Sequence, residues 1–283
     1  MNKNFIRIIP RLDIKNGQLI KGINLEGLRV LGDPNNFSKK YYETGADEIC
    51  YVDNVATLYG TINLLKFVKQ TSKDVYIPLT VGGGIRSIKN IEEMLKNGAD
   101  KVGLNSAGII KPKFIREASR NFGSSTITIM IETVKYENKY KIVYSNGRDL
   151  VNKNPVDWAK QVEDLGAGEI ILTSVNHEGI KEGFDLEITE KISKAVKIPV
   201  LAHGGAGNYQ NVFDVINNSN ISGVIISSMF HYSYCFDFNF KKKEKKELGN
   251  FNFINNKKNK LKKAYSINGL KKFLKMKKVD VRL

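Results

Sequence analysis

The sequence predicts an α/β protein folded as a single (β/α)8 (TIM) barrel domain with an internal two-fold half-barrel duplication. Eight short runs of β-branched and other apolar residues alternate with amphipathic segments along the 283 residues. This alternation is typical of buried parallel strands joined by helices. Glycine-containing phrases also recur at one interval, because Gly45 and Gly166 lie 121 residues apart, as do Gly83 and Gly204. A repeat at a fixed interval indicates duplication of a four-strand half.

The first half of the chain supplies four strand–helix units. Its apolar runs are short enough for strands, and glycine follows several of the amphipathic segments, which favours the left-handed conformation that ends a helix. We expect strands at residues 6–13, 48–52, 77–81 and 101–104, and helices at residues 34–44, 63–71, 88–97 and 112–121.

The second half repeats this order. The phrase ETGADEICYVD at residues 43–53 resembles DLGAGEIILTS at residues 164–174, and IRIIPRLDIKNG aligns with ITIMIETVKYEN. We expect strands at residues 126–131, 169–173, 200–203 and 224–227, and helices at residues 155–165, 185–195 and 209–217. A last helix at residues 267–277 follows an insertion at residues 232–263 that is rich in Lys, Asn and Phe and that we expect at the face carrying the active site.

The formal net charge of +16 is concentrated at one end of the chain. Residues 241–283 contain 16 Lys and Arg but 3 Asp and Glu, so the rest of the chain is nearly balanced. This distribution favours a solvated tail over a nucleic-acid surface. There is no apolar run of membrane-spanning length and no signal peptide, and Cys50 and Cys235 form no motif, so we expect a cytoplasmic protein with free thiols.

Glycine clusters follow the third and seventh predicted strands. In such barrels, ligands bind at the carboxyl ends of the strands, and phosphate commonly binds after strands 7 and 8. Glycine lets backbone N–H groups approach an anion closely. We therefore expect one phosphate at each of two sites across the barrel mouth. The first site contains Gly83, Gly84, Asn105 and Ser106, and the second contains Gly204, Gly205, Gly207, Ser227 and Ser228.

Acidic residues end two of the predicted strands. Asp13 ends the first strand and Glu132 the fifth, so they face each other across the barrel, and two carboxyl groups that flank a substrate suit general acid–base catalysis. The alternative for Asp13 is a salt bridge to Lys15 or Lys21. Lys21 is expected to orient Asp13 or a substrate oxygen. Asp53 and Glu178 lie at other strand ends as further substrate-binding candidates, and the three histidines show no metal-ligand spacing.

These residues stand within an ordered set of phrases that identifies a family. RIIPRLDIKNG, LIKGINLEGLR, IPLTVGGGIRS, NGADKVGLNSA and LGAGEIILTS resemble the cyclase subunits of imidazole glycerol phosphate synthase, and the resemblance runs from about residue 7 to residue 232. It implies a (β/α)8 barrel without a metal or organic cofactor. It further implies that ammonia and a bis-phosphorylated aminoimidazole carboxamide ribonucleotide give imidazole glycerol phosphate, in histidine biosynthesis, with ammonia from a separate glutaminase subunit.

The resemblance implies one catalytic residue on the first predicted strand and another on the fifth. The family's first catalytic aspartate matches Asp13 and its lysine matches Lys21. The second catalytic aspartate falls on Glu132, and the cysteine that usually precedes the first aspartate falls on Arg11. Two further aspartates of the family fall on Asn176 and Glu178, which also depart from the pattern.

The resemblance also implies an ammonia gate at the opposite end of the barrel. Arg7 and Asp13 share side-chain parity six residues apart, so they lie at the bottom and top of one strand, about 20 Å apart. A plain salt-bridge plug is the alternative to a gate. Asp100 and Lys181 match glutaminase-contacting positions of the family. The four gate positions fall on Arg7, Glu48, Lys101 and Glu169.

Two other functions stay open at the level of the sequence. The chain could be a paralogue that channels ammonia to a sugar amidotransferase in surface polysaccharide synthesis, since the acidic positions depart from the family while the gate is complete. The basic tail could bind nucleic acid, in which case binding would be sensitive to salt.

Overall fold

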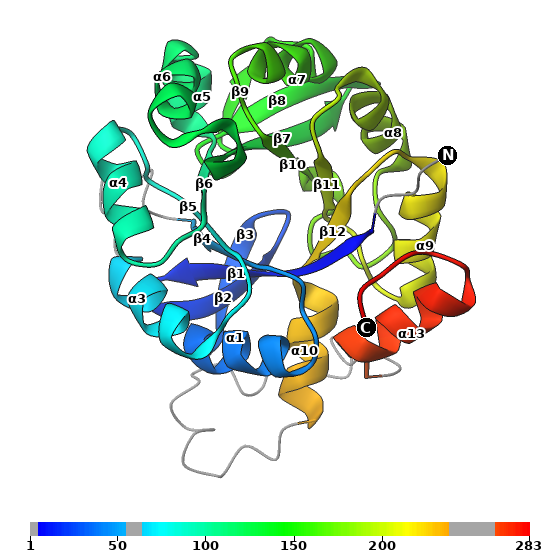
Figure 1. The fold of residues 1–283 in the computed structure, drawn as a ribbon. Coiled ribbons are helices and arrows are strands. Elements are labelled where there is room, and N and C mark those ends of the chain that lie inside the picture. Colours follow the sequence, from blue (N-terminus) through cyan, green and yellow to red (C-terminus); the bar gives the residue numbers. More distant parts are fainter. Residues whose placement is uncertain (1–4, 55–63, 238–263) are drawn as a thin grey trace.

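Eight parallel strands close into a barrel in the computed structural model, which describes residues 5–54, 64–237 and 264–283 (Figure 1). Each strand pairs in parallel with the next, and the eighth pairs back onto the first through Arg7 and Gly223. The predicted (β/α)8 barrel is confirmed. In order around the barrel, the strands are β1 (Arg7–Lys15), β4 (Ile49–Asp53), β5 (Leu79–Gly82), β6 (Lys101–Leu104), β7 (Ile127–Tyr136), β10 (Glu169–Ser174), β11 (Val200–His203) and β12 (Gly223–Ile226).

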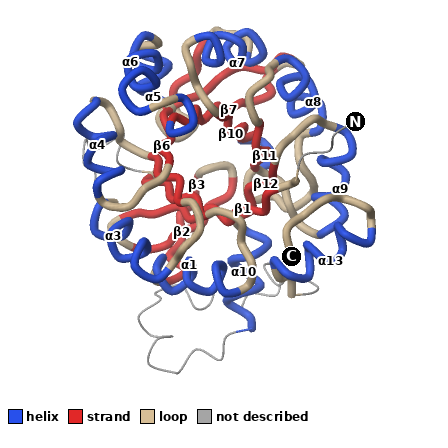
Figure 2. The backbone as a smooth tube through the Cα atoms, in the orientation of Figure 1, coloured by secondary structure: helices blue, strands red, loops and turns tan. Residues whose placement is uncertain are grey.

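Helices form an outer ring around this barrel (Figures 1 and 2). Every helix predicted from the sequence has a counterpart, and α5 and α10 are additional. The helices are α1 (Pro34–Glu43), α3 (Leu65–Asp74), α4 (Ile88–Lys96), α5 (Ser106–Ile110), α6 (Lys113–Phe122), α7 (Pro155–Asp164), α8 (Leu186–Ala195), α9 (Tyr209–Asn218), α10 (Ser228–Asp237) and α13 (Ile267–Met276), with short 3-10 turns η1 (Ser124–Thr126) and η2 (Val175–His177). No helix among the described residues is long and apolar enough to cross a membrane.

The helix starts repeat between the two halves. The Asp33 side chain accepts hydrogen bonds from the first-turn N–H groups of α1, and Asn154, 121 residues later, does the same for α7. Each cap is followed by a proline in the first turn, where its missing N–H costs no hydrogen bond. Ser87 and Asn208 cap α4 and α9 at the same interval. The duplication therefore extends to the signals that start the helices.

An apolar layer fills the middle of the barrel. A thin cluster of inward-facing residues lies separate from the larger core between strands and helices. The tip of Met130 occupies space left by two glycines, because a Cβ atom on Gly82 or Gly103 would lie 2.6 or 2.3 Å from its Cε. The cluster consists of Ile9, Cys50, Val52, Met130, Ile171, Leu201 and Ile225.

Two hairpins rise from the mouth of the barrel and depart from the sequence prediction. β1 continues past Asp13 and turns back into β2 (Gln18–Ile23) and β3 (Glu26–Gly32). β7 continues past Glu132 into β8 (Lys139–Tyr144) and β9 (Asp149–Val151). The two acidic residues thus lie within strands rather than at strand ends, because each strand leaves the barrel sheet and pairs with its own hairpin.

The C-terminal part begins with an element that the sequence analysis did not predict. α10 starts at Ser228 and includes the first residues of the expected insertion at 232–263, whereas residues 238–263 lie outside the described part of the chain. The predicted final helix is confirmed as α13. Its Lys271 Nζ donates to Asp47 Oδ1 at 2.7 Å, and this nearly buried ion pair fixes α13 to the start of β4.

Candidate active site

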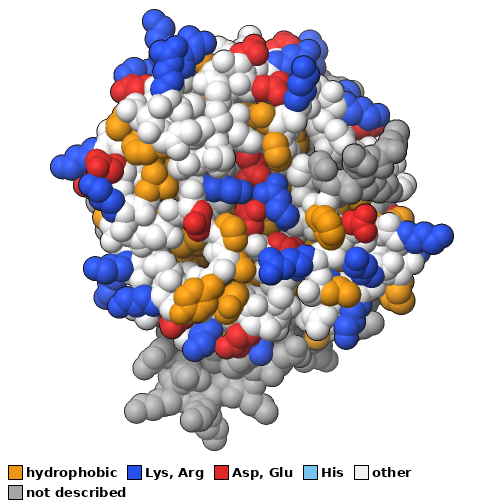
Figure 3. All heavy atoms as spheres, in the orientation of Figure 1, with side chains coloured by type: hydrophobic (Ala, Val, Ile, Leu, Met, Phe, Trp, Pro, Cys, Tyr) orange, Lys and Arg blue, Asp and Glu red, His pale blue; other side chains and the backbone are white. Residues whose placement is uncertain are grey.

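The end of the barrel where the strands start carries a closed set of ion pairs, which we call the floor cluster. Arg7 Nη1 and Nη2 lie 2.6 Å from Glu48 and 2.5 Å from Glu169. Lys101 Nζ lies 3.1 and 3.3 Å from the same two carboxylates. Figure 3 shows acidic and basic side chains gathered at the centre of one end of the barrel. The four residues predicted to form the gate therefore contact one another, with both signs balanced.

The two predicted partner-contacting residues lie at opposite ends of the barrel. Asp100 precedes β6, and its Oδ2 accepts from the backbone N–H of Leu79 at 2.8 Å near the floor. Lys181 lies in the loop after β10 at the mouth, with Nζ 5.1 Å from the ring centroid of Tyr232. Asp100 thus lies at the floor and Lys181 at the mouth, so the two predicted partner-contacting residues do not lie together.

Asp13 and Glu132 point into the mouth from β1 and β7, on opposite sides of the barrel. Both are buried. The expected partners of Asp13 were Lys15 and Lys21, but its Oδ1 accepts from Arg11 Nε at 2.9 Å. Glu132 Oε2 is buried and has no hydrogen-bond partner among the described residues. One carboxyl is therefore held by a cation, while the other keeps a free oxygen.

The pKa of Glu132 is perturbed toward neutrality. Burial raises it to about 7, against the opposing effects of the Arg11 charge and of a hydrogen bond from Asn105, and the charge of Asp13 adds to the rise. A carboxyl group with a pKa near the working pH can both give and take a proton efficiently. Glu132 is therefore suited to general acid–base chemistry.

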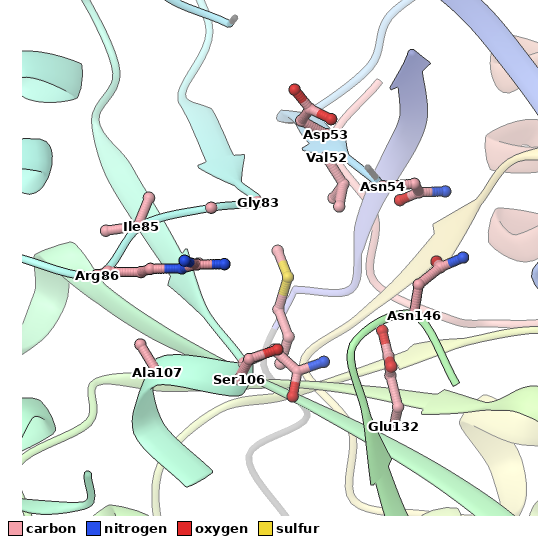
Figure 4. Close-up of a pocket in the computed structure, with 14 residues that line it drawn as sticks. Val52, Asp53, Asn54, Gly83, Ile85, Arg86, Ser106, Ala107, Glu132 and Asn146 are labelled. Atoms are coloured by element: carbon pink, nitrogen blue, oxygen red, sulfur yellow. The ribbon is translucent and has the colours of Figure 1, made fainter. Parts of the chain in front are cut away.

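An open pocket beside Glu132 contains the first glycine cluster. It measures about 520 Å³ including its open entrance. Figure 4 shows Arg86 extending toward its middle from the loop after β5, with Glu132 and Asn146 on the opposite side. The pocket brings together the predicted residues Asp53, Gly83, Gly84, Asn105, Ser106 and Glu132.

Gly204 and Gly205 of the second glycine cluster line a smaller pocket of about 240 Å³ with Glu178, His203, Ser227 and Ser228, whereas Gly207 is not part of its lining. Gly205 O accepts from Gly183 N at 2.8 Å, so the loop after β10 packs directly on this cluster. A Cβ atom on Gly205 or Gly207 would lie 1.9 Å from a carbonyl oxygen of that loop. Both predicted clusters reach the mouth, but the second is more tightly covered.

Lys21 contacts Glu178 rather than Asp13. Lys21 Nζ and Glu178 Oε1 form an ion pair, and both side chains are almost completely buried. Glu178 also accepts from the backbone N–H of Leu25 at 3.3 Å. The pair thus joins the β2–β3 hairpin to the loop after β10, over the mouth of the barrel.

Three residues of the mouth were not predicted as site residues. Arg86 follows the glycine cluster in the phrase GGGIRS, and a cation there is a signal for anion binding. Arg11 shares side-chain parity with Arg7 and Asp13, so strand alternation indicates that it points inward. Asn146 belongs to the β8–β9 turn, and no signal in the sequence placed that turn over the mouth. The described residues contain no group of three or more His, Cys, Asp or Glu that could hold a metal.

Comparisons with known proteins agree with this geometry. The family model described as histidine biosynthesis protein matches residues 7–235. The imidazole glycerol phosphate synthase subunit HisF of Legionella pneumophila is 48% identical over 206 residues, which cover 72% of this chain and 97% of the relative. The subunit of the same name from Bacillus cereus strain G9842 is 44% identical over 227 residues, covering 80% of this chain and 90% of the relative. The chain therefore belongs to the histidine biosynthesis protein family and resembles its HisF subunits over nearly their whole length.

Proposed function

We propose that this chain is the cyclase and lyase subunit of a glutamine-dependent imidazole glycerol phosphate synthase. The observation that carries the proposal is the pair of buried carboxyl groups, Asp13 on β1 and Glu132 on β7, in a barrel of this family, with Glu132 lining the pocket of the first glycine cluster. The relatives carry the name of this synthase, and their names therefore do not favour the alternative role in sugar amidation.

In this proposal, the glycine clusters bind the two phosphates of the ribonucleotide. Backbone N–H groups near Gly83 and Gly84 and the hydroxyl of Ser106 would hold one phosphate, and the loop at Gly204, Gly205 and Gly207 with Ser227 and Ser228 would hold the other. A substrate fixed at both ends has its reacting centre between the carboxyl groups. Such positioning supplies a large part of the rate enhancement in reactions of this kind.

The carboxyl groups would move the protons of the reaction. When the nitrogen lone pair of ammonia forms the new bond to an unsaturated carbon, the π electrons of that carbon move to the atom to which it was doubly bonded, and the attacking nitrogen releases a proton that a carboxylate accepts. When the carbon–nitrogen bond of the intermediate breaks, the departing nitrogen receives a proton from a carboxyl group. We assign these proton transfers to Asp13 and Glu132. The residues proposed to bind the rest of the substrate are Asp53, Asn105, Lys21 and Glu178.

The test is turnover of the bis-phosphorylated ribonucleotide by the purified chain with an ammonium salt in place of the glutaminase. We expect turnover that falls about 100-fold or more in Asp13→Asn and in Glu132→Gln, as is typical for loss of acid–base catalysis. Lys191→Met, at an exposed ion pair, is the matched control and should keep wild-type turnover. A folded wild-type chain without turnover, and with none gained in Glu132→Asp, would overturn the proposal.

We further propose that the glutaminase subunit docks at the floor, around Asp100, and that the floor cluster separates its ammonia from the barrel interior. Lys101→Met should therefore lower turnover with glutamine and the glutaminase while leaving turnover with ammonium salt unchanged. Equal loss with both nitrogen sources would contradict a gating role. We also propose a cytoplasmic location, with which the free thiols of Cys50 and Cys235 are consistent and which cell fractionation can check.

A further inference from the structure

The side chain of Met130 runs across the inside of the barrel. Met130 belongs to β7, and its Sδ and Cε lie against Gly103 on β6 and Gly82 on β5. The two glycines pair with each other, so their missing side chains leave one shared slot. A Cβ atom on Gly82 would lie 2.6 Å from the Cε and 3.0 Å from the Sδ of Met130. The flexible end of the Met130 side chain therefore fills a slot that two neighbouring strands provide.

Met130 also separates two spaces. On one side is the pocket of the first glycine cluster, whose lining reaches down to Met130, Gly103 and Val52. On the other side is the barrel interior, where Met130 belongs to the apolar layer together with Cys50. Cys50 is not part of the lining of the pocket, and it precedes Val52 by two residues on β4, nearer the floor. The end of the Met130 side chain thus lies between the pocket and the interior that contains Cys50.

Buried polar atoms without a partner lie on both sides of Met130. Thr128, Met130 and Glu132 alternate along β7, so their side chains face the same way, into the barrel. Thr128 pairs with Glu169 of the floor cluster, whereas Glu132 lies at the mouth. Thr128 Oγ1, Glu132 Oε2 and Asn105 Oδ1 are buried and have no hydrogen-bond partner in the described parts of the chain. Buried polar atoms of this kind suit a small molecule that donates hydrogen bonds.

We propose that the end of the Met130 side chain is a movable plug between the barrel interior and the pocket, and that ammonia passes when it leaves its slot. The route runs from Thr128, behind the floor cluster, to Glu132 and Asn105. A methionine suits this role because its unbranched side chain can change rotamer without a movement of β7. The identity of the small molecule rests on the proposed function, whereas the closure of the interior by Met130 does not.

The first experiment uses Cys50 as a reporter behind the plug. Cys50 is 1% exposed, so a small thiol reagent such as methyl methanethiosulfonate reaches it when the layer opens. Met130→Ala empties the slot, and the labelling rate of Cys50 by mass spectrometry should rise at least about tenfold, because a minor open conformation is populated at about 10% or less. The buried thiol of Cys235 on α10 is the internal control. Equal Cys50 rates in wild type and Met130→Ala, or an equal rise at Cys235, would overturn the proposal.

A matched variant fills the slot with an immobile side chain. Met130→Ala combined with Gly82→Val removes and adds the same number of side-chain heavy atoms. The φ of Gly82 is not positive, and without the methionine the nearest atom to the new Cβ, outside the adjoining residues, is Gly103 O at 3.4 Å. Valine has one stiff side-chain torsion, so the slot stays closed. Cys50 should then react no faster than in wild type, and a rate as high as in Met130→Ala would contradict the plug.

Met130→Leu covers the case in which Met130→Ala does not fold because of the cavity that it leaves. Leucine keeps the number of side-chain atoms, and a swap of similar volume is well tolerated. Its side chain is shorter than that of methionine and leaves the slot between Gly82 and Gly103 unfilled. Cys50 should therefore react faster than in wild type, and an unchanged rate in the folded leucine variant would contradict the proposal.

Turnover then tests the ammonia route. The ratio of turnover with glutamine and the glutaminase to turnover with ammonium salt cancels effects on the chemistry in the pocket. In Met130→Ala with Gly82→Val this ratio should fall about tenfold, equivalent to a barrier higher by about 1.4 kcal/mol, whereas in Met130→Ala it should not fall. An unchanged ratio in the double variant would overturn the route. A wild type without turnover from either nitrogen source would overturn the proposed function, while Cys50 labelling would still decide whether Met130 closes the interior.

Discussion

Replacing Lys21 by methionine should destabilise the whole barrel. Lys21 and Glu178 are each 2% exposed and form an ion pair, and Lys21 Nζ also donates to the carbonyl oxygen of Gly22 at 3.0 Å. Removing the ammonium group leaves the Glu178 carboxylate buried, with the N–H of Leu25 as its remaining hydrogen-bond donor among the residues that the structure describes. Breaking a buried pair by removing one partner costs about 3–5 kcal/mol, whereas replacing both partners by apolar groups is often neutral.

The assay is thermal unfolding at pH 8. At about 2 °C per kcal/mol for a chain of this size, Tm should fall by roughly 6–10 °C at pH 8. Lys21→Met combined with Glu178→Met should recover most of the loss. Lys191→Met is the control at the exposed pair with Glu187, which contributes at most about 1 kcal/mol.

Two outcomes would refute the reasoning. A Tm of Lys21→Met within about one degree of wild type at pH 8 would mean that the carboxylate of Glu178 finds water or another donor. A double variant no more stable than Lys21→Met would mean that lost packing, rather than an unpaired charge, destabilises the single variant.

Three further predictions concern single positions. Folding raises the pKa of Glu132 from 4.5 to about 7, so between these pH values the folded state holds a proton that the unfolded state has lost. The free energy of unfolding of the wild type should therefore fall by about 3 kcal/mol as pH rises from 4.5 to 7. Urea unfolding of Glu132→Gln should not show this fall. Gly205→Ala should lower the free energy of unfolding by more than about 2 kcal/mol, since φ is +110° and the new Cβ would lie 1.9 Å from a carbonyl oxygen. Gly27→Ala is the control, because φ is +61° and no atom lies within 4 Å of the new Cβ, and it should cost about 1 kcal/mol. Thermal unfolding measures both variants. Lys271→Met should cost about 3 kcal/mol by leaving Asp47 unpaired, and limited proteolysis should then release the C-terminal helix at a concentration of protease that leaves wild type intact.

The barrel could be predicted because its signals are local and repeated. Strand runs, proline after a capping side chain and glycine after a helix each act within a few residues, so the sequence alone places the elements. The hairpins could also have been predicted from the sequence, because Asn-Gly is a strong hairpin signal. Asn16–Gly17 and Asn146–Gly147 lie in the turns and have positive φ values. They were missed because the strands were ended at the acidic residues.

The ion-pair partners could not be predicted in the same way. Asp13 has Arg11, Lys15 and Lys21 nearby in sequence. In the hairpin register Asp13 pairs with Ile20, so Lys21 projects to the opposite face of the two strands. Arg11 lies deeper on the same face as Asp13, and both side chains are almost completely buried. The choice of partner thus depends on register and depth, which only the folded chain defines.

The repeated glycines have a packing cause that is independent of any ligand. A Cβ atom on Gly83 would lie 2.4 Å from Asp53 O, and one on Gly204 would lie 2.8 Å from Ser174 O, at the equivalent position 121 residues later. Both loops therefore need glycine in order to cross the end of the preceding strand. What differs between the halves is the side chains around each loop, because Arg86 lies at the open pocket of the first loop, whereas backbone from the loop after β10 covers the second. The duplicated backbone fixes the geometry of both loops, and the unduplicated side chains decide which ligand group each of them can bind.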